Sequence, residues 1–238
     1  MPFLTARWSN LCLLTYAVPP ALLEPRLPPG CALDTRDGQA FVSLVAFDFL
    51  DTRVLGVPWP GYRNFPEINL RFYVRHGTGE SAVRGVAFVR EFVPKRLIAF
   101  LARTIYREPY LATPMSSRVT EGDARITVEH RLTFARGENR LTVVGRKPTA
   151  MPAPDGTEHF FKEHEWGFGA GRRGACIRYQ VSHPHWDCHT VESYELEWDW
   201  RAVYGDEFAF LATATPCSVL LAVGSSVGVH PMAAVVRP

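Results

Sequence analysis

One short stretch, FPEINLRFYV at residues 65–74, most strongly limits what this chain can fold into. Every second residue is apolar, and the other set places Glu67, Asn69 and Arg71 in a row between Phe65 and Tyr73. Because successive side chains of a strand point to opposite faces, the pattern predicts a β-strand with one apolar face. The opposite face is open to two interpretations. It is either the polar wall of a cavity or a solvent-exposed face with an ordinary ion pair, which contributes about 0–1 kcal/mol.

The residues that follow predict a turn, a second strand and a helix. Gly77 and Gly79 can adopt the positive φ that a reversal needs, and residues 86–92 alternate as a returning strand would. Pro94 fits the first position of a helix, where its missing N–H is not needed. The helix would bury an apolar stripe at helical spacing, made of Leu97, Ile98, Leu101 and Ile105.

Lys95 and Arg96 would lie in the first turn of this helix, at the positive end of its dipole. A protonated amine is poorly placed there, and the neighbouring positive charge disfavours it further. Both effects would leave more of the Lys95 side chain as free amine. This placement is one way to activate a lysine. The other interpretation is a pair of surface side chains whose charged ends reach into water.

Short alternating segments run along the rest of the chain, with few helical patterns among them. One hairpin is predicted from residues 32–35 and 41–49, joined by an Asp-Gly turn signal. The last strand, residues 218–229, would bend at Gly224. About ten such strands predict an α+β, mainly β fold, with a largely antiparallel sheet curled into a barrel or two layers. Since nothing marks a domain boundary, we expect one domain over residues 1–238.

Two loop regions carry side chains of functional interest. Residues 54–63 are rich in proline and glycine, and Trp59 and Tyr62 make this loop a candidate lid or rim. His183 and His185 could form a metal pair if both faced one side of a strand. Pro184 breaks the strand, however, and the histidine spacing matches no zinc signature. The sequence therefore predicts no metal ligands and no cofactor.

Composition excludes several classes of function. The net charge is +2 and basic residues are spread along the chain, which argues against nucleic acid as a partner. The five cysteines include no CxxC pair, which favours a reduced, cytoplasmic protein. No apolar run approaches the roughly 20 residues of a membrane helix, so we expect no membrane partner.

Five segments together resemble the YqjF-like family of uncharacterised bacterial proteins. The resemblance runs from about Trp8 to about Val229, and its combination is specific although each piece alone is weak. The segments are FPEINLRFYV, RGVAFVREFVPKRL, REPYLATPM, EHEWGFG and VSHPHW. This family is similar in fold to acetoacetate decarboxylase, which implies a cone-shaped antiparallel sheet with outer helices and an internal pocket.

The resemblance also implies roles for particular residues. The decarboxylase carries a Pro-Lys-Lys turn whose first lysine forms a Schiff base with substrate. REFVPKRL resembles the segment with that turn, so Lys95 falls at the Schiff-base position and Arg96 replaces the neighbouring lysine. Arginine keeps the charge but has a larger, planar head. Glu67 resembles the pocket glutamate.

Three hypotheses for function follow. In the first, the protein binds a small polar or carboxylate metabolite inside the sheet, with Arg71 or Arg96 pairing with a carboxylate and Asn69, Tyr73 and Phe65 completing the wall. In the second, it is an enzyme of decarboxylase, aldolase or dehydratase type, in which Lys95 forms an imine with a keto acid and Glu67 moves protons. The third is a non-catalytic scaffold or partner-binding protein. A homo-oligomer is compatible with all three.

Overall fold

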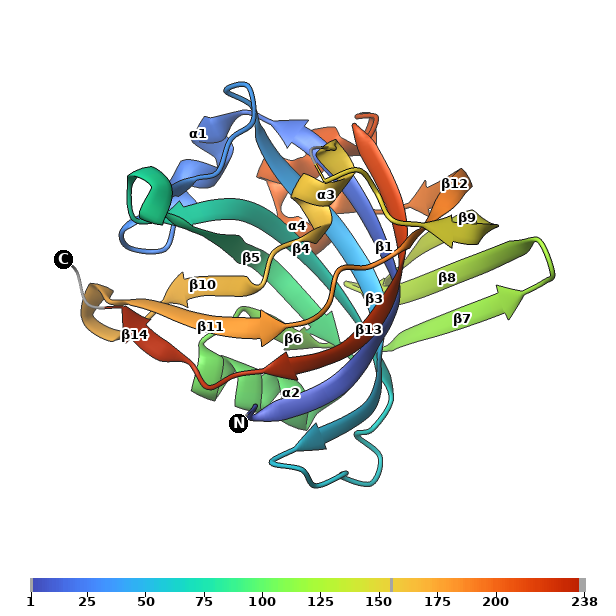
Figure 1. The fold of residues 1–238 in the computed structure, drawn as a ribbon, viewed down its shortest axis with the longest axis horizontal. Helices are drawn as coiled ribbons and strands as arrows, with labels where there is room; N and C mark the ends of the chain where they lie inside the picture. The colour runs from blue at the N-terminus through green and yellow to red at the C-terminus, as the bar shows by residue number, and fades with distance from the viewer. Residues whose placement is uncertain (1, 155, 236–238) are drawn as a thin grey trace.

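A computed structural model of the protein describes residues 2–154 and 156–235 (Figure 1). The strands are β1 (Leu4–Val18), β2 (Cys31–Leu33), β3 (Ala40–Val54), β4 (Phe65–His76), β5 (Val83–Val93), β6 (Tyr110–Ala112), β7 (Met115–Glu121), β8 (Arg125–Phe134), β9 (Gly137–Ala150), β10 (Trp166–Ala170), β11 (Cys176–Ser182), β12 (Cys188–Glu197), β13 (Ser218–Val229) and β14 (Ala233–Val235). The helices are α1 (Pro20–Leu23), α2 (Arg96–Leu101), α3 (Thr157–Lys162) and α4 (Trp200–Tyr204). Short 3-10 or π turns are η1 (Glu24–Arg26), η2 (Gly79–Ser81), η3 (Ala102–Tyr106), η4 (Arg172–Gly174) and η5 (Asp206–Ala212).

All fourteen strands belong to one sheet, part of which closes on itself. The closed part runs β11-β10-β5-β4-β3-β1-β13, and β13 then pairs back to β11 through Val181 with Val229 and Ser182 with Gly228. The strands β12, β9, β8 and β7 continue from β13 as an extension, and β7 and β8 project away from the ring (Figure 1). The predicted mainly β, curled sheet is therefore confirmed. It is mixed, because β5 pairs in parallel with β6 and β10.

One glycine allows β13 to change neighbours. Before Gly224, β13 pairs with β12, and after it the strand pairs with β11 to close the ring. Gly224 has φ +82°, and a Cβ there would lie 2.1 Å from the backbone oxygen of Trp8. No side chain fits at that distance, so the predicted bend at Gly224 is confirmed and depends on the missing Cβ.

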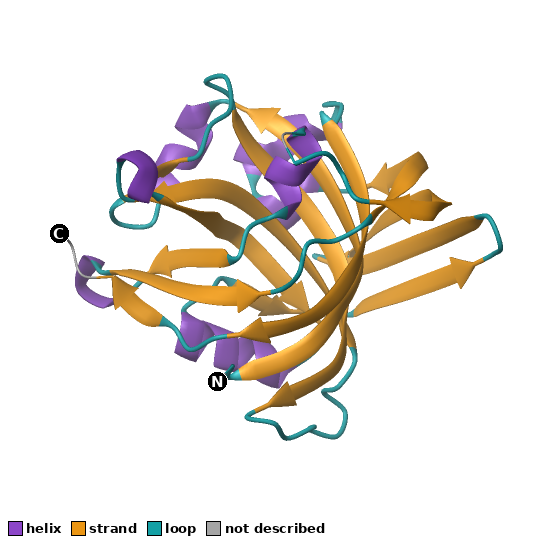
Figure 2. Cartoon of the chain, viewed as in Figure 1, coloured by secondary structure: helices purple, strands orange, loops and turns teal. Residues whose placement is uncertain are grey.

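The two faces of β4 contribute to two separate cores. Ile68, Leu70 and Phe72 are fully buried in an outer core that also contains Trp200 of α4 and Leu23 of α1. The inner core of the ring contains aromatic side chains from several elements, namely Phe47, Phe49, Phe65, Tyr73, Phe161 and Trp186. Of the helices, α2 lies along the outer edge of the curled sheet (Figure 2), whereas α3 places Phe161 in the inner core. The period-two prediction for residues 65–74 is confirmed, and both faces are buried.

Three sequence-based expectations about local structure are wrong. Residues 32–35 and 41–49 do not form a hairpin, because β2 pairs with β4 rather than β3. The helix after Pro94 begins at Arg96, and Lys95 is its N-cap residue. Its apolar stripe is not buried: Leu97 and Leu101 are 38% and 40% exposed.

Candidate ligand-binding site

The inside of the strand ring holds a cavity of about 400 Å³. Most of its wall is apolar, with aromatic side chains from β1, β3 and β4 that include Trp8, Phe47 and Phe65. Polar groups on the wall include Glu67, Asn69 and Arg71 of β4 and a few side chains of other elements. The cavity therefore suits a small organic molecule held mainly by apolar contact and oriented by a few polar groups.

Glu67 and Asn69 lie on the inner face of β4 and line this cavity. The Asn69 amide donates a hydrogen bond to Glu67 Oε1 at 3.0 Å, and the Tyr110 hydroxyl donates to Glu67 Oε2 at 2.8 Å. Strand register explains the meeting, because Asn69 stands opposite Glu91 on β5 and Glu91 stands opposite Tyr110 on β6. These four side chains therefore form one polar band across three strands.

Three buried glutamates converge on this band: Glu67, Glu91 and Glu108 all line the cavity. Burial raises the pKa of Glu67 to about 7, against the hydrogen bonds from Tyr110 and Asn69. Burial likewise raises the pKa of Glu108 to about 8, opposed by a hydrogen bond from Tyr179 and reinforced by the charge of Glu67. Burial, then the charges of Glu108 and Glu67, raises the pKa of Glu91 well above its usual range. The cluster therefore holds protons at neutral pH and can both donate and accept hydrogen bonds.

One glycine in β10 makes room for this cluster. A Cβ at Gly167 would lie 2.3 Å from Cζ of Tyr179, whose ring crosses that position and lines the cavity. Gly167 thus lets Tyr179 of the neighbouring strand β11 reach Glu108, with which it hydrogen-bonds.

A cationic side chain, Arg71, lines the cavity further along β4. It donates a hydrogen bond from Nη2 to the backbone oxygen of Phe161 at 2.8 Å, whereas its buried Nε has no hydrogen-bond partner among the described residues. Both ring nitrogens of His164 are also buried without a described partner. Burial, then the charges of Arg71 and Arg84, lowers the pKa of His164 well below its usual range. This imidazole is therefore neutral beside the guanidinium at neutral pH.

Lys162, the last residue of α3, places a fully buried amine at the cavity wall. Its Nζ bonds the Glu163 carboxylate, whose other oxygen lies 3.0 Å from Nδ1 of His185. Burial opposes ionisation of Glu163, but the hydrogen bond from Lys162 and the charges of Lys162 and His185 outweigh it and lower the pKa of this carboxyl.

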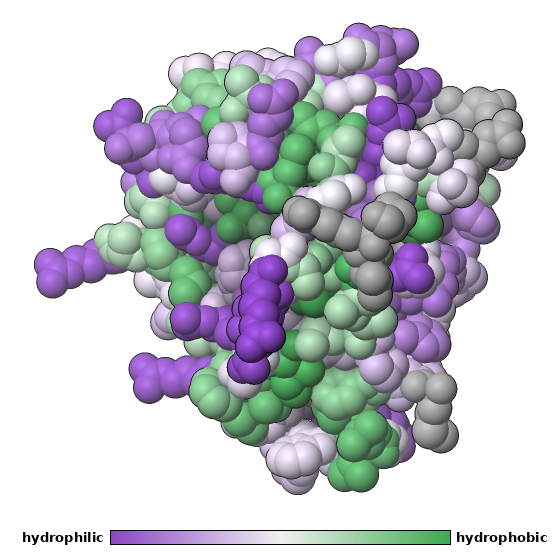
Figure 3. Space-filling view, turned by 90° about the vertical axis from the view of Figure 1, so that its left-hand side faces the viewer, coloured by the Kyte–Doolittle hydropathy of each residue, from purple (hydrophilic) through white to green (hydrophobic). Residues whose placement is uncertain are grey.

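The rim of the cavity comes from two exposed segments. Trp59 and Tyr62 of the loop after β3 line it, as predicted for a rim, together with Leu97, Ile98 and Leu101 of α2. Apolar side chains gather on the lower part of the face seen in Figure 3, the side on which α2 lies in Figure 1. The half-exposed stripe of α2 is explained by this position at the mouth.

The residues expected at the site separate into two groups. The structure brings Phe65, Glu67, Asn69 and Arg71 together on the cavity wall. Tyr73, Lys95 and Arg96 are not among the described residues that line it. Tyr73 is buried beneath the wall, where its hydroxyl lies 2.5 Å from Ser43 Oγ and donates to the oxygen of Phe161 at 3.3 Å.

Lys95 and Arg96 sit outside the cavity because of where α2 begins. Lys95 is half-buried, with its Nζ 5.8 Å from the centroid of the Tyr62 ring. Arg96, the first residue of the helix, is exposed. The predicted meeting of Glu67 with the Lys95 amine inside the pocket is therefore not observed in this structure.

Sequence reasoning missed Glu91, Glu108, Tyr110, Lys162 and His164. All five fall within segments that carry the family resemblance or directly beside one. On β5 the simple alternation failed, because a register shift beside Arg71 places Val86, Phe88 and Glu91 on the cavity side. Knowledge of the strand pairing, in which Glu91 lies opposite Asn69 and Tyr110 opposite Glu91, would have identified both residues.

Comparison with known proteins identifies the family. A family model, DUF2071, described as an uncharacterized conserved protein, matches residues 5–226. The chain belongs to this family. A curated relative, the uncharacterized protein YqjF of Bacillus subtilis (strain 168), is 33% identical over 118 residues. That match covers 49% of this chain and 47% of YqjF, so it spans about half of each protein.

Solved structures show which fold this DUF2071 chain shares. Acetoacetate decarboxylase from Legionella pneumophila matches with a TM-score of 0.64 at 13% identity, over 99% of this chain and 88% of that one. An acetoacetate decarboxylase-like enzyme from Sphingomonas wittichii RW1 matches with a TM-score of 0.66 at 14% identity, over 99% and 95%. The enduracididine biosynthesis enzyme MppR, complexed with pyruvate, matches with a TM-score of 0.65 at 14% identity, over 98% and 91%. The fold is therefore that of the acetoacetate decarboxylase-like enzymes. Within the described ranges, no helix has the length and apolar character needed to span a bilayer.

Proposed function

We propose that the protein binds a small organic acid with a second polar group inside the ring of strands. The observation that carries the proposal is a set of buried polar atoms on the cavity wall that have no hydrogen-bond partner among the described residues. They include Asn69 Oδ1, Glu91 Oε1, Glu108 Oε1 and Arg71 Nε. A buried polar atom left without a partner costs about 1–3 kcal/mol, so a ligand that satisfies these atoms recovers stability.

The order of polar groups along β4 defines the class of ligand. Arg71 at one end suits a carboxylate or carbonyl oxygen. Four residues away, Glu67 and its neighbours present carboxyl groups that hydrogen-bond a hydroxyl, amine or carbonyl. At about 3.3 Å per residue the two backbone positions are about 13 Å apart along the strand, so a small acid would contact one of the two ends directly rather than span both.

A keto acid is the class to test first. MppR, which shares the fold, has been solved with pyruvate and with the condensation product of pyruvate and imidazole 4-carboxaldehyde. Those compounds belong to MppR, and at 14% identity the likeness extends to the fold alone. They support the choice because a protein of this fold has been solved with a keto acid bound.

Ligand-induced stabilisation tests the proposal. The protein is unfolded thermally in the presence of keto acids, hydroxy acids and amino acids, and a ligand at 100 times its Kd should add about 2.7 kcal/mol. Arg71→Met should abolish the gain. Arg75→Met is the matched control, because Arg75 is exposed on the same strand. If no compound of these classes stabilises the protein, or if both variants bind alike, the binding proposal fails and a scaffold function is favoured.

An imine-forming enzyme is the second candidate function. It is favoured by the Lys162 amine at the wall and by Glu67, whose pKa of about 7 is suited to proton transfer at neutral pH. In this reaction the Lys162 ammonium first gives a proton to the Glu163 carboxylate that it contacts. The free amine nitrogen then attacks the keto carbon, a C–N bond forms, and the carbonyl oxygen leaves as water. The resulting imine withdraws electrons from the neighbouring bond.

Borohydride trapping distinguishes the two lysines. Borohydride reduces an imine to a stable amine, so peptide mapping after treatment with a keto acid locates the modified residue. We expect the label on Lys162, lost in Lys162→Met and retained in Lys95→Met. A label on Lys95 would instead support the role implied by the family resemblance, through a movement of α2. Protein left unlabelled by a broad panel of carbonyl compounds would argue against the enzyme and leave the binding proposal in place.

A further inference from the structure

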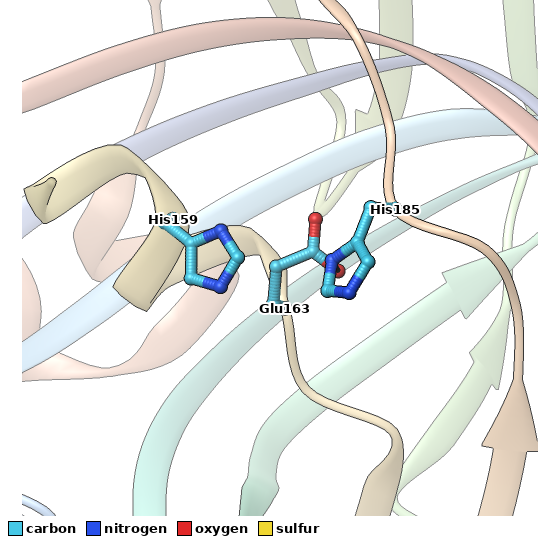
Figure 4. A group of neighbouring side chains, drawn as sticks. All are labelled: His159, Glu163 and His185. Carbon is cyan, nitrogen blue, oxygen red and sulfur yellow. Dashed lines mark ion pairs between the residues drawn. The ribbon is translucent and has the colours of Figure 1, made fainter. Parts of the chain in front are cut away.

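Two histidines and a glutamate meet beside the cavity wall, outside the polar band. His159 lies on α3, Glu163 directly follows α3, and His185 lies in the segment between β11 and β12. Figure 4 shows the three side chains turned toward one another from these two segments. One ligand atom from each residue lies within 4.8 Å of the others.

The three side chains of this group already contact one another. Glu163 Oε2 lies 3.0 Å from His185 Nδ1, and the rings of His159 and His185 stack with centroids 5.4 Å apart. His159 Nδ1 is buried and has no hydrogen-bond partner among the described residues. The spacing of His159 and Glu163, four residues apart, places both on one side of a helical turn.

We infer that His159, Glu163 and His185 form a binding site for a divalent transition metal of the Zn²⁺ class. Imidazole nitrogen and carboxylate oxygen are ligands that Zn²⁺ takes at about 2.0–2.2 Å, and three protein ligands leave a fourth position for water or a small molecule. Bound ligand atoms would then lie about 3.4 Å apart in a tetrahedral arrangement. His185 is mostly exposed and can rotate to close the remaining distance.

The neighbouring lysine positions the carboxylate for this role. Lys162 bonds Glu163 through Oε1, which leaves Oε2 on the side of His185. A hydrogen bond to the non-coordinating oxygen orients a metal-binding carboxylate. Lys162 and His164 line the cavity on either side of Glu163 in the sequence. A bound ion would therefore connect this part of the cavity wall to the segment before β12, which contains His185.

Metal titration of the whole chain tests the inference. Protein stripped with EDTA is titrated with Zn²⁺ by calorimetry and with Co²⁺ by visible absorption. We expect one ion per chain and the absorption of tetrahedral Co²⁺. Mutation of a residue that only hydrogen-bonds to a metal ligand typically lowers metal affinity by about 10–100-fold. His185 would be a ligand itself, so His185→Gln should weaken Zn²⁺ binding at least about tenfold. His185 is exposed, so this variant should fold normally.

His183→Gln is the matched control, because His183 lies two residues away and stacks on Trp186 rather than joining the group. Its affinity for Zn²⁺ should equal that of the wild type. The inference is overturned if the wild type binds no Zn²⁺, or if His185→Gln and His183→Gln bind it equally. It is also overturned if Co²⁺ shows thiolate charge-transfer absorption, which would assign binding to the cysteines. None of these results depends on an organic ligand in the cavity.

Discussion

The two faces of β4 are equally buried and differ completely in chemistry. On the outer face, Ile68, Leu70 and Phe72 are 0% exposed and belong to a large cluster of buried apolar side chains. On the inner face, Glu67 and Asn69 are 4% and 3% exposed, yet polar atoms on that wall have no described partner. The inner face has the properties of a site that a ligand completes.

The largest effect should come from the outer face. Phe72→Ala removes a fully buried ring from the outer core and leaves a cavity, so unfolding should become easier by about 3–5 kcal/mol. Arg71→Met, one residue away on the inner face, should change the unfolding free energy by less than about 1 kcal/mol, because an apolar side chain of similar length replaces a buried cation. Urea denaturation of both variants measures the difference. Equal losses would remove the distinction between the faces.

The second-largest effect should be a pH dependence of the unfolding free energy, caused by the buried glutamates of the inner face. Glu67 and Glu108 ionise near pH 4.5 in the unfolded chain and with pKa values of about 7 and about 8 in the folded protein, and burial raises the pKa of Glu91 well above its usual range as well. Between these values the folded state binds more protons, so the unfolding free energy falls as pH rises. The buried, neutral His130 and His164 act in the opposite direction, but only below about pH 6.5. Between pH 6.5 and 8 we therefore expect a loss of about 3 kcal/mol, at about 1.4 kcal/mol per pKa unit.

Urea titrations at pH 6.5, 7, 7.5 and 8 would measure this loss. A protein with glutamine at positions 67, 91 and 108 is the control, and its stability should be nearly constant over the same window. A wild-type profile as flat as that of the control would show that the carboxyl groups are solvated.

A smaller effect should separate stability from binding at one residue. Glu91→Gln keeps the shape of the side chain but removes a group that must hold a proton when buried. At pH 8 the unfolding free energy should rise by about 1–2 kcal/mol, after the loss of one hydrogen bond of about 1 kcal/mol. Affinity for any cavity ligand should fall in the same variant. If Glu91→Gln lowers stability, the acid is needed for the fold rather than for a ligand.

The smallest effect on stability is expected at the rim. Trp59 is 51% exposed, so Trp59→Ser should change the unfolding free energy by no more than about 0.5 kcal/mol. It should nevertheless speed ligand dissociation, because Trp59 covers the mouth of the cavity. Stopped-flow measurements with a bound ligand test this, and an unchanged rate would place ligand entry elsewhere.

The sequence was sufficient where a periodic pattern and a local signal agree. The alternation of residues 65–74 correctly predicted a strand with two distinct faces, and Gly224 marked the bend in the last strand. The family resemblance correctly implied the curled sheet and its interior. Each of these depends on properties of single residues or of nearest neighbours in the chain.

The rest depends on contacts between distant segments. Glu91 reaches the cavity because of a shift in strand register, which alternation within β5 does not encode. Lys95 misses the cavity because α2 starts at Arg96, two residues after the predicted start at Pro94, so the Lys95 backbone is extended rather than helical. Lys162 belongs to a six-residue helix whose position is set by the packing of Phe161 inside the ring. Neither the register nor the packing can be deduced from short-range spacing.

At Gly224, β13 approaches β1 so closely that only a hydrogen atom fits in the place of a side chain, and the width of the interior depends on this approach. A methyl group at that position would collide with the carbonyl of Trp8, so β13 could not keep its distance from β1. Because β13 also closes the ring through β11, the circumference of the ring depends on a residue that is not among the described residues lining the cavity.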